Sequence, residues 1–254
     1  MYFKFLLAVS VSVAAVAWLS QPTAANGPAH RSVVVELFTS EGCSSCPPAD
    51  ELLSRLRKQG SESGVEIIPL GFHVDYWNYQ GWQDRFSSSQ YSKRQESYAA
   101  QLRTEGPYTP EMVVDGSQEF VGNDVTRATS AIAAAGAKVA SAQVSLKSQN
   151  GKLAVSVAGQ PDGSGEVWLA ITEDNLSSRV AAGENTGRTL HHDAVVRDFR
   201  SLGRLQVGKF EKTLPVAFQR DWKPGDLHIV VFVQRPQTGT ITGAAEIPAA
   251  VLAQ

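Results

Sequence analysis

The sequence predicts an α/β domain with the element order β-α-β-α-β-β-α, followed by an all-β, sandwich-like extension. A strand, a helix and a second strand are indicated within residues 31–72, and a further helix and a hairpin follow them. Beyond residue 140, strand-like runs separated by turns replace the helical periodicity. Because 254 residues suffice for one large or two small domains, we expect the first domain to span residues 30–138 and the second residues 141–250.

The amino-terminal residues have the pattern of a secretory signal peptide. Lys4 precedes an apolar run from Leu6 to Leu19, and the small residues of Thr23-Ala24-Ala25 suit signal peptidase. An uncleaved membrane anchor is the alternative, but about 14 apolar residues are fewer than the roughly 20 that span a bilayer. We therefore expect residues 1–25 to be a signal peptide, and the mature protein to be periplasmic or secreted, without a membrane span.

The charge balance gives no reason to expect a polyanionic partner. The whole chain carries a formal charge of −2, and loss of the segment that holds Lys4 makes it more negative. Nucleic acids and anionic membrane surfaces attract basic proteins, so neither is expected as a partner.

The first half of the predicted α/β domain begins with a β-branched run, Arg31 to Phe38, which indicates a buried strand. Leucines at helical spacing follow between Cys43 and Gln59, and Gly60 fits the end of that helix. A second buried strand is indicated from Val65 to Phe72. A strand, helix, strand unit of this kind predicts parallel pairing through a right-handed crossover.

Its second half begins with a helix from Phe86 to Leu102, which carries aromatic residues at intervals. Two short strands, Glu111 to Val114 and Glu119 to Val121, are joined at Asp115-Gly116, a dipeptide that favours a hairpin. Asp124 can cap a third helix that runs to about Ala135. This order of elements is typical of thioredoxin-like domains.

The remaining residues alternate in the manner of strands. Turn signals such as Asn150-Gly151 and Asp162-Gly163 separate them. The predicted strands are Ala142–Leu146, Leu153–Val157, Glu166–Ile171, Val195–Arg200, Glu211–Leu214 and Leu227–Gln234. Such a set predicts a small sandwich packed on the first domain.

The only two cysteines, Cys43 and Cys46, lie three positions apart between a strand and a helix. A bridge across so short a loop stabilises the fold little, and the helix dipole favours a thiolate at Cys43. We expect Cys43 to be the exposed nucleophile and Cys46 the deeper, resolving thiol. An inert disulfide is the alternative; zinc is disfavoured because no second cysteine pair exists.

Three further residues are candidates for a role beside the cysteines. In the order above, Thr109-Pro110 precedes the third strand, where a cis-proline would face the sulfurs and present a backbone edge to a peptide. Glu36 could accept a proton from Cys46. It stands seven positions before Cys43, one more than is usual in thioredoxin-like proteins. Because side chains alternate between the two faces of a strand, the extra residue would place Glu36 on the face away from Cys46, unless the turn between them is one residue longer.

Two polar or aromatic segments remain. His73, Asp75, Tyr76, Trp77 and Trp82 follow the second strand and could line a peptide groove or pack as a lid over the sheet. The segment from Gly183 to Asp193 could fold over the cysteines and supply Arg188 or a histidine, or be a hydrogen-bonded loop between domains. Adjacent histidines on a strand point to opposite faces and make a poor metal pair.

Four motifs together resemble an uncharacterised family of bacterial secreted proteins with a thioredoxin-like domain. They are VVELFTSEGCSSCPPAD, FHVDYWNYQGW, YTPEMVVDG and GENTGRTLHHDAVV. The resemblance implies a thioredoxin-like fold with a β-rich extension, and thioredoxin roles for Cys43, Cys46 and Pro110. It does not identify a substrate.

These observations predict a thiol-disulfide oxidoreductase that exchanges with thiols or disulfides of exported proteins and needs no cofactor or metal. It would also need a redox partner, which the sequence does not identify. One alternative is Cu(I) handling by the two sulfurs with His73 or His191. Another is a noncatalytic binding module that keeps the fold and the bridge.

Overall fold

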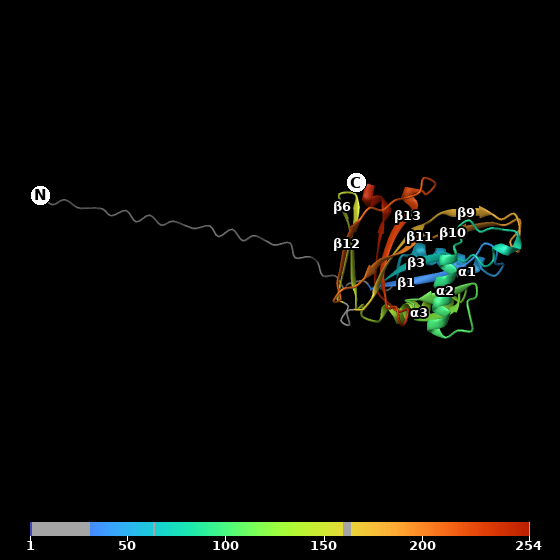
Figure 1. Cartoon of the computed structure of the whole chain (residues 1–254), viewed down its shortest axis with the longest axis horizontal. Coiled ribbons are helices and arrows are strands. Elements are labelled where there is room, and N and C mark those ends of the chain that lie inside the picture. Colours follow the sequence, from blue (N-terminus) through green and yellow to red (C-terminus); the bar gives the residue numbers. More distant parts are fainter. Residues whose placement is uncertain (2–30, 63, 160–163, 254) are drawn as a thin grey trace.

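The computed structural model describes Met1 and residues 31–62, 64–159 and 164–253, which form a mixed α/β fold with one large sheet and few helices (Figure 1). The predicted signal peptide and the Asp162-Gly163 turn lie outside the described residues. The helices are α1 (Pro47–Gln59), α2 (Ser89–Leu102) and α3 (Val125–Gly136), with short 3-10 turns at Asn78–Gln80, Pro224–Asp226 and Ala249–Ala253. Within the described residues, no helix is long and apolar enough to cross a membrane.

The large sheet has nine strands, eight of them in the order β14-β13-β8-β11-β3-β1-β4-β5, with β2 paired to β3. The members that come first in the chain are β1 (Arg31–Thr39), β2 (Ser61–Glu62), β3 (Val65–His73), β4 (Glu111–Val114) and β5 (Gln118–Val121). The later members are β8 (Glu166–Glu173), β11 (Val195–Arg204), β13 (Leu227–Gln234) and β14 (Ile241–Pro248). Strands from both predicted domains therefore share one sheet, joined where Val195 of β11 pairs with Gly71 of β3.

Alternate residues of β1 supply the two hydrophobic cores that flank the sheet. Val35 and Leu37 pack with the leucines of α1 and the alanines of α3. Val34 and Phe38 face the other way and pack with Tyr98 of α2. Helices therefore cover both faces of this part of the sheet, and this explains why β1 is buried along most of its length.

The predicted elements of the first half are confirmed, with shifted ends. β1 and β3 pair in parallel, and β4 and β5 form an antiparallel hairpin. α1 begins only at Pro47, because the residues before it form a turn. α2 begins after Ser88, whose hydroxyl caps it, rather than at Phe86.

The second half contains a separate three-stranded sheet, β12-β7-β6, at the end of the molecule away from α1 and α2 (Figure 1). Its strands are β6 (Gln143–Gln149), β7 (Lys152–Ala158) and β12 (Phe210–Leu214). Their apolar residues pack with those of β8 and β13 in one core, so two sheets face each other there.

Four strands were missed in the sequence: the two-residue β2, β14, and the hairpin of β9 (Leu176–Arg179) and β10 (Thr189–His192). β14 contains glycine and alanine in place of most β-branched residues, and the hairpin strands are short and polar. Local patterns of this kind do not indicate strands.

Candidate functional site

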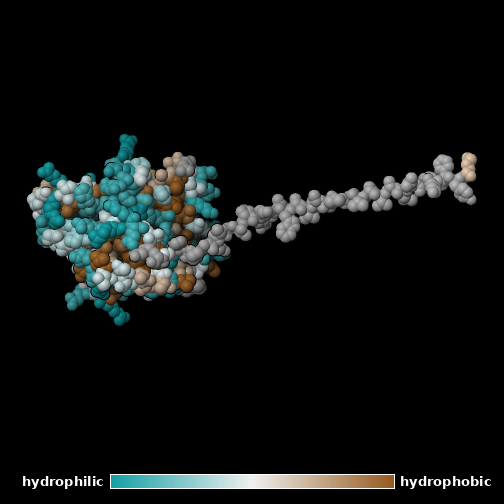
Figure 2. Space-filling model, turned by 180° about the vertical axis from the view of Figure 1, so that it is seen from behind, coloured by the Kyte–Doolittle hydropathy of each residue, from teal (hydrophilic) through white to brown (hydrophobic). Residues whose placement is uncertain are grey.

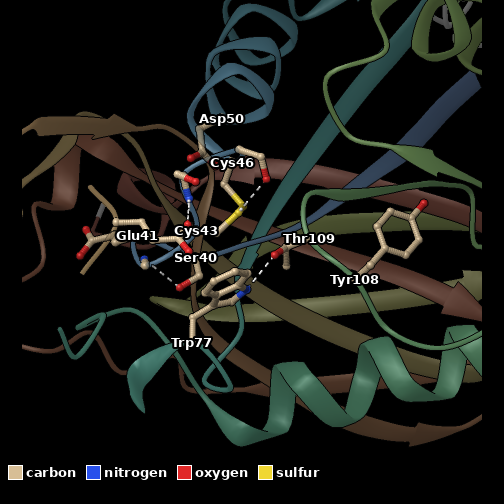
Figure 3. The surroundings of a disulfide bond; sticks show 12 residues. Ser40, Glu41, Cys43, Cys46, Asp50, Trp77, Tyr108 and Thr109 are labelled. Atoms are coloured by element: carbon tan, nitrogen blue, oxygen red, sulfur yellow. Dashed lines mark hydrogen bonds between the residues drawn. A yellow bond between two sulfur atoms is a disulfide. The ribbon is translucent and has the colours of Figure 1, made fainter. Parts of the chain in front are cut away.

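Cys43 and Cys46 form a disulfide in the turn between β1 and α1 (Figure 3). The amide of Cys43 donates to the carbonyl of Ser40, and the amide of Cys46 donates to the carbonyl of Cys43. Cys46 is the N-cap of α1, and the two prolines after it occupy the first helical positions, where an amide hydrogen has no helical partner. The sequence thus shapes the turn and the helix start around the two sulfurs.

Both cysteines are completely buried, with 0% of their surface exposed. This corrects the expectation that Cys43 is exposed while Cys46 lies deeper. The Ser45 hydroxyl lies 3.3 Å from the Cys43 sulfur, and it must be the donor, because a disulfide sulfur carries no hydrogen. Because the Cys43 sulfur is buried, a reacting molecule reaches it only after the residues that cover it move.

The cover is the loop 180–188, between β9 and β10, which folds back over the cysteine turn. Asn185 is fully buried and its Nδ2 donates to the carbonyls of Glu41 and Cys43, each at 2.9 Å. A carboxylate oxygen of Glu184 accepts from the amide of Ser44 at 3.0 Å. Nη1 of Arg188 donates to Oδ1 of Asn185 at 2.8 Å. Of the two possibilities left open for this segment, the structure shows the one in which it folds over the cysteines, with Asn185 making the central contacts.

The aromatic segment after β3 closes the opposite side of the turn. Trp77 donates from Nε1 to the Thr109 hydroxyl at 2.8 Å, and Figure 3 shows both side chains below the disulfide. A Cβ on Gly42 would lie 3.0 Å from the Trp77 Cβ, so glycine allows this close approach without a shift of the tryptophan. Tyr76 and Tyr79 are exposed. On the face of the molecule drawn in Figure 2, hydrophobic residues lie in separate patches among hydrophilic ones.

The Thr109–Pro110 peptide bond is cis, as predicted. Pro110 is buried and precedes β4, and its carbonyl accepts from the amide of Gly122 at 2.9 Å. A Cβ on Gly122 would come within 3.2 Å of both Pro110 and Ala49. Glycine at this position therefore lets the proline loop pack against the first turn of α1, next to the cysteines.

Glu36 is not brought to Cys46. Its side chain lies on the α2 face of the sheet, where Arg94 donates to both carboxylate oxygens, at 2.5 Å and 2.9 Å. Tyr98 donates to the same carboxylate at 2.6 Å. The proton-acceptor role expected of Glu36 is therefore not supported, because the strand alternation turns it away and the extra residue is not absorbed.

A different group of buried acids and histidines lies beside the cysteine turn. Its members are Glu41, Asp50, His73, Asp84 and His192, and none is more than 6% exposed. Asp84 bonds to Nδ1 of His73 at 2.7 Å and accepts from the amide of Glu41. Glu41 accepts from Nε1 of Trp82 at 2.8 Å. We call these five residues the acid-histidine cluster.

Burial and mutual attraction set the ionisation of this cluster. Burial disfavours the charged form of His73, but Asp84 beside it raises the pKa of His73 to about 8. Burial works to raise the pKa of Glu41, yet the neighbouring His192 holds it below its ordinary value. Asp50 differs, because burial raises the pKa of its carboxyl despite the attraction of both histidines.

The pKa of His73 predicts a pH-dependent stability. Because this pKa is higher in the folded chain than the ordinary 6.5, protonated His73 stabilises the fold fully below pH 6.5, and the contribution is lost as the pH rises through about 8. The loss amounts to about 2 kcal/mol of unfolding free energy. Urea unfolding on both sides of this window measures it. His73→Gln should flatten the profile and His191→Gln, at an exposed histidine, should not; equal stability on both sides would contradict the assignment.

The two histidines considered as copper ligands have different surroundings. His73 is buried with its Nδ1 on Asp84, whereas His191 is exposed on β10. His192 points to the buried side of the same strand, as predicted for adjacent histidines. Across the described ranges, no group of three or more histidine, cysteine or acidic side chains is arranged to hold a metal ion.

Sequence reasoning missed Glu41, Asp50, Asp84 and Asn185. Asp50 could have been noticed, since it follows Cys46 by four residues on a predicted helix and so shares its face. Asn185 and Asp84 give no local signal. They meet the cysteine turn through contacts that span 142 and 43 positions of sequence.

Comparison with other proteins places the chain in a family. A family described as "Protein of unknown function (DUF1223)" matches residues 34–234. A crystal structure of protein AGR_C_4864 from Agrobacterium tumefaciens is similar with a TM-score of 0.71 and 28% identity, over 85% of this chain and 94% of that one. HBP35 of Porphyromonas gingivalis shares the fold with a TM-score of 0.60 at 14% identity, over 87% and 76% of the two chains. No protein with curated annotation matches. The chain therefore belongs to the DUF1223 family, whose function is unknown.

Proposed function

We propose that this protein is a thiol-disulfide oxidoreductase with a thioredoxin-like domain, which acts in the periplasm on exported proteins. The observation that carries the proposal is the Cys43–Cys46 disulfide, placed between β1 and α1 beside the cis Thr109–Pro110 bond. The amino-terminal sequence pattern supports export.

The topology around the cysteines supports the thioredoxin-like assignment. The strands β3-β1-β4-β5 are consecutive in the sheet, with β1 and β3 parallel and β4 and β5 antiparallel to their neighbours. α1 and α3 pack on one face and α2 packs on the other. A shared fold alone does not establish an activity, so the argument rests on the chemistry of the site.

The proposed reaction is exchange between a dithiol and a disulfide. In the reduced protein, the Cys43 thiolate attacks a substrate disulfide, and one substrate thiolate leaves with a pair of electrons. The Cys46 thiolate then attacks Cys43, the bond between Cys43 and substrate breaks, and the second substrate thiolate leaves. The substrate gains two electrons and the protein regains its disulfide; the reverse sequence oxidises a substrate dithiol. The direction depends on the reduction potential relative to the compartment.

Equilibration with a glutathione redox buffer tests the proposal. We expect the native protein to pass reversibly between disulfide and dithiol, measured by mass after quenching with an alkylating agent. Because Asn185 holds the cover with two hydrogen bonds of about 1 kcal/mol each, Asn185→Ala should accelerate exchange about tenfold or more without changing which cysteines react.

Thr186→Ala is the matched control, because Thr186 is exposed in the same loop and bonds only within it. It should exchange at the rate of the unmodified protein. If neither the native chain nor Asn185→Ala exchanges, while the urea-unfolded chain does, the protein is a noncatalytic module with a structural bridge.

A further inference from the structure

The acid-histidine cluster contains buried polar atoms that the fold alone does not explain. Among the described side chains, both ring nitrogens of His192 and Oε1 of Glu41 lack a hydrogen-bond partner. Nε2 of His192 lies 3.4 Å from this Glu41 oxygen, and Nδ1 lies 3.9 Å from Oδ2 of Asp50. Buried polar groups that lack a well-formed hydrogen bond are costly, and in native proteins they often mark functional positions.

Asp50 connects this cluster to the reacting sulfurs. The amide of Asp50 donates to the carbonyl of Cys46 at 3.1 Å, so the two residues are one helical turn apart on α1. Side chains four positions apart share a helix face, and Figure 3 shows Asp50 directly above Cys46. Asp50 also borders, together with Thr39, His73 and His192, a gap that is too narrow to hold a water molecule.

We propose that Asp50 accepts the proton of the Cys46 thiol during disulfide exchange, and that His192, carried by the β9–β10 hairpin, is the positioning residue that acts on Asp50. The inference rests on the proposed function. Before attack, the proton of the Cys46 thiol moves to the Asp50 carboxylate. The Cys46 thiolate then displaces the substrate thiolate from Cys43, and that thiolate takes up a proton from Asp50 or from solvent.

The charges around Asp50 suit this role. His192 faces it from β10 and His73 from β3, while Glu41 and Asp84 add two carboxylates. Asp193, beside the same gap, is paired with Lys58. Burial raises the pKa of the Asp50 carboxyl above that of an ordinary aspartate, which brings its proton affinity closer to that of a thiol.

The test separates the two sulfurs. Reduced protein is mixed with DTNB, which gives one thionitrobenzoate as Cys43 attacks and a second as Cys46 closes the bridge. In Asp50→Asn, the first release should stay within about twofold of the unmodified rate. The second release, which reports closure of the bridge by Cys46, should slow about a hundredfold near neutral pH. The pH dependence of its rate should be that of a thiol without a proton acceptor, with a midpoint near 8.5. Asp50→Glu should restore part of the rate.

Neighbouring exposed residues supply matched controls. Glu51→Gln changes the adjacent exposed carboxylate of α1, and His191→Gln changes the adjacent exposed histidine of β10; both should behave as the unmodified chain. His192→Gln should shift the midpoint of the second phase while leaving the first phase intact. If Asp50→Asn slows the second phase no more than Glu51→Gln does, the inference is wrong.

A second measurement keeps this test independent of the proposed function. In Cys43→Ala, the ultraviolet absorbance of the Cys46 thiolate gives its titration directly. If Asp50 and Cys46 share a proton, the titration curve of the Cys46 thiolate has two steps. Adding Asp50→Asn should leave a single step, that of the thiol alone. Absence of the first DTNB phase would count against the proposed function. An unchanged Cys46 titration would count against Asp50, whether or not exchange occurs.

Discussion

Replacing Cys46 by alanine is expected to convert a transient mixed disulfide into a stable one. The variant keeps Cys43 as attacking thiol but lacks the sulfur that would displace the bound partner. When it is expressed in an exporting host, disulfide-linked partner proteins should accumulate and appear on a non-reducing gel as bands that reducing agent removes. Identifying them by mass spectrometry would name the substrates.

The reciprocal variant is the control for this trapping. Cys43→Ala retains a buried thiol at Cys46 but should trap no partner and should abolish exchange with glutathione. In the reduced unmodified protein, alkylation should reach Cys43 well before Cys46. Equal trapping by both variants, together with equal alkylation of the two cysteines, would remove the distinction between attacking and resolving thiols.

Replacing Arg94 by alanine is expected to cause the largest loss of stability. Arg94 is about 9% exposed, pairs with the fully buried Glu36 and packs over the rings of Phe72, Phe199 and Phe232. Its removal leaves a buried carboxylate without its cation, which costs about 3–5 kcal/mol of unfolding free energy. Urea or thermal unfolding measures the loss.

A double variant distinguishes an unpaired charge from lost packing. Replacing both partners, as Glu36→Leu with Arg94→Met, should recover much of the stability, because neither charge then remains buried alone. Arg200→Ala removes the partly exposed pair with Asp198 and should cost less than about 1 kcal/mol. A similar small loss for Arg94→Ala would show that Glu36 takes up a proton or finds solvent.

Local patterns predicted the parts of the site that depend on neighbouring residues. The β-branched run of β1, the leucine spacing of α1 and the Asp115-Gly116 turn each follow from backbone preference or periodicity. The order of these elements then located the cysteine pair and the cis bond at Thr109. Each element is thus encoded locally, and only their order along the chain was needed to locate the site.

The loop that covers the cysteines and the acid-histidine cluster depend instead on contacts between residues far apart in the sequence. Asn185 and His192 acquire their roles only when the β9–β10 hairpin reaches the β1–α1 turn, and the sequence around them reads as a polar loop. The number of residues between Glu36 and Cys43 gave a reason to doubt that Glu36 faces the cysteines. Its partner Arg94, however, lies 58 positions away and could not be identified from the sequence. Burial of polar side chains by distant segments leaves no periodic signal, so these contacts could not be predicted.

The distance in sequence between the cysteines and their cover sets an order of events while the chain is being made. Cys43 and Cys46 need only a four-residue turn to meet, whereas Glu184 contacts Ser44 across 140 positions. Closing a short loop is much faster than assembling long-range contacts. The pair is therefore open to oxidants and reductants in the newly synthesised chain, and its redox state can be set before the completed fold encloses it.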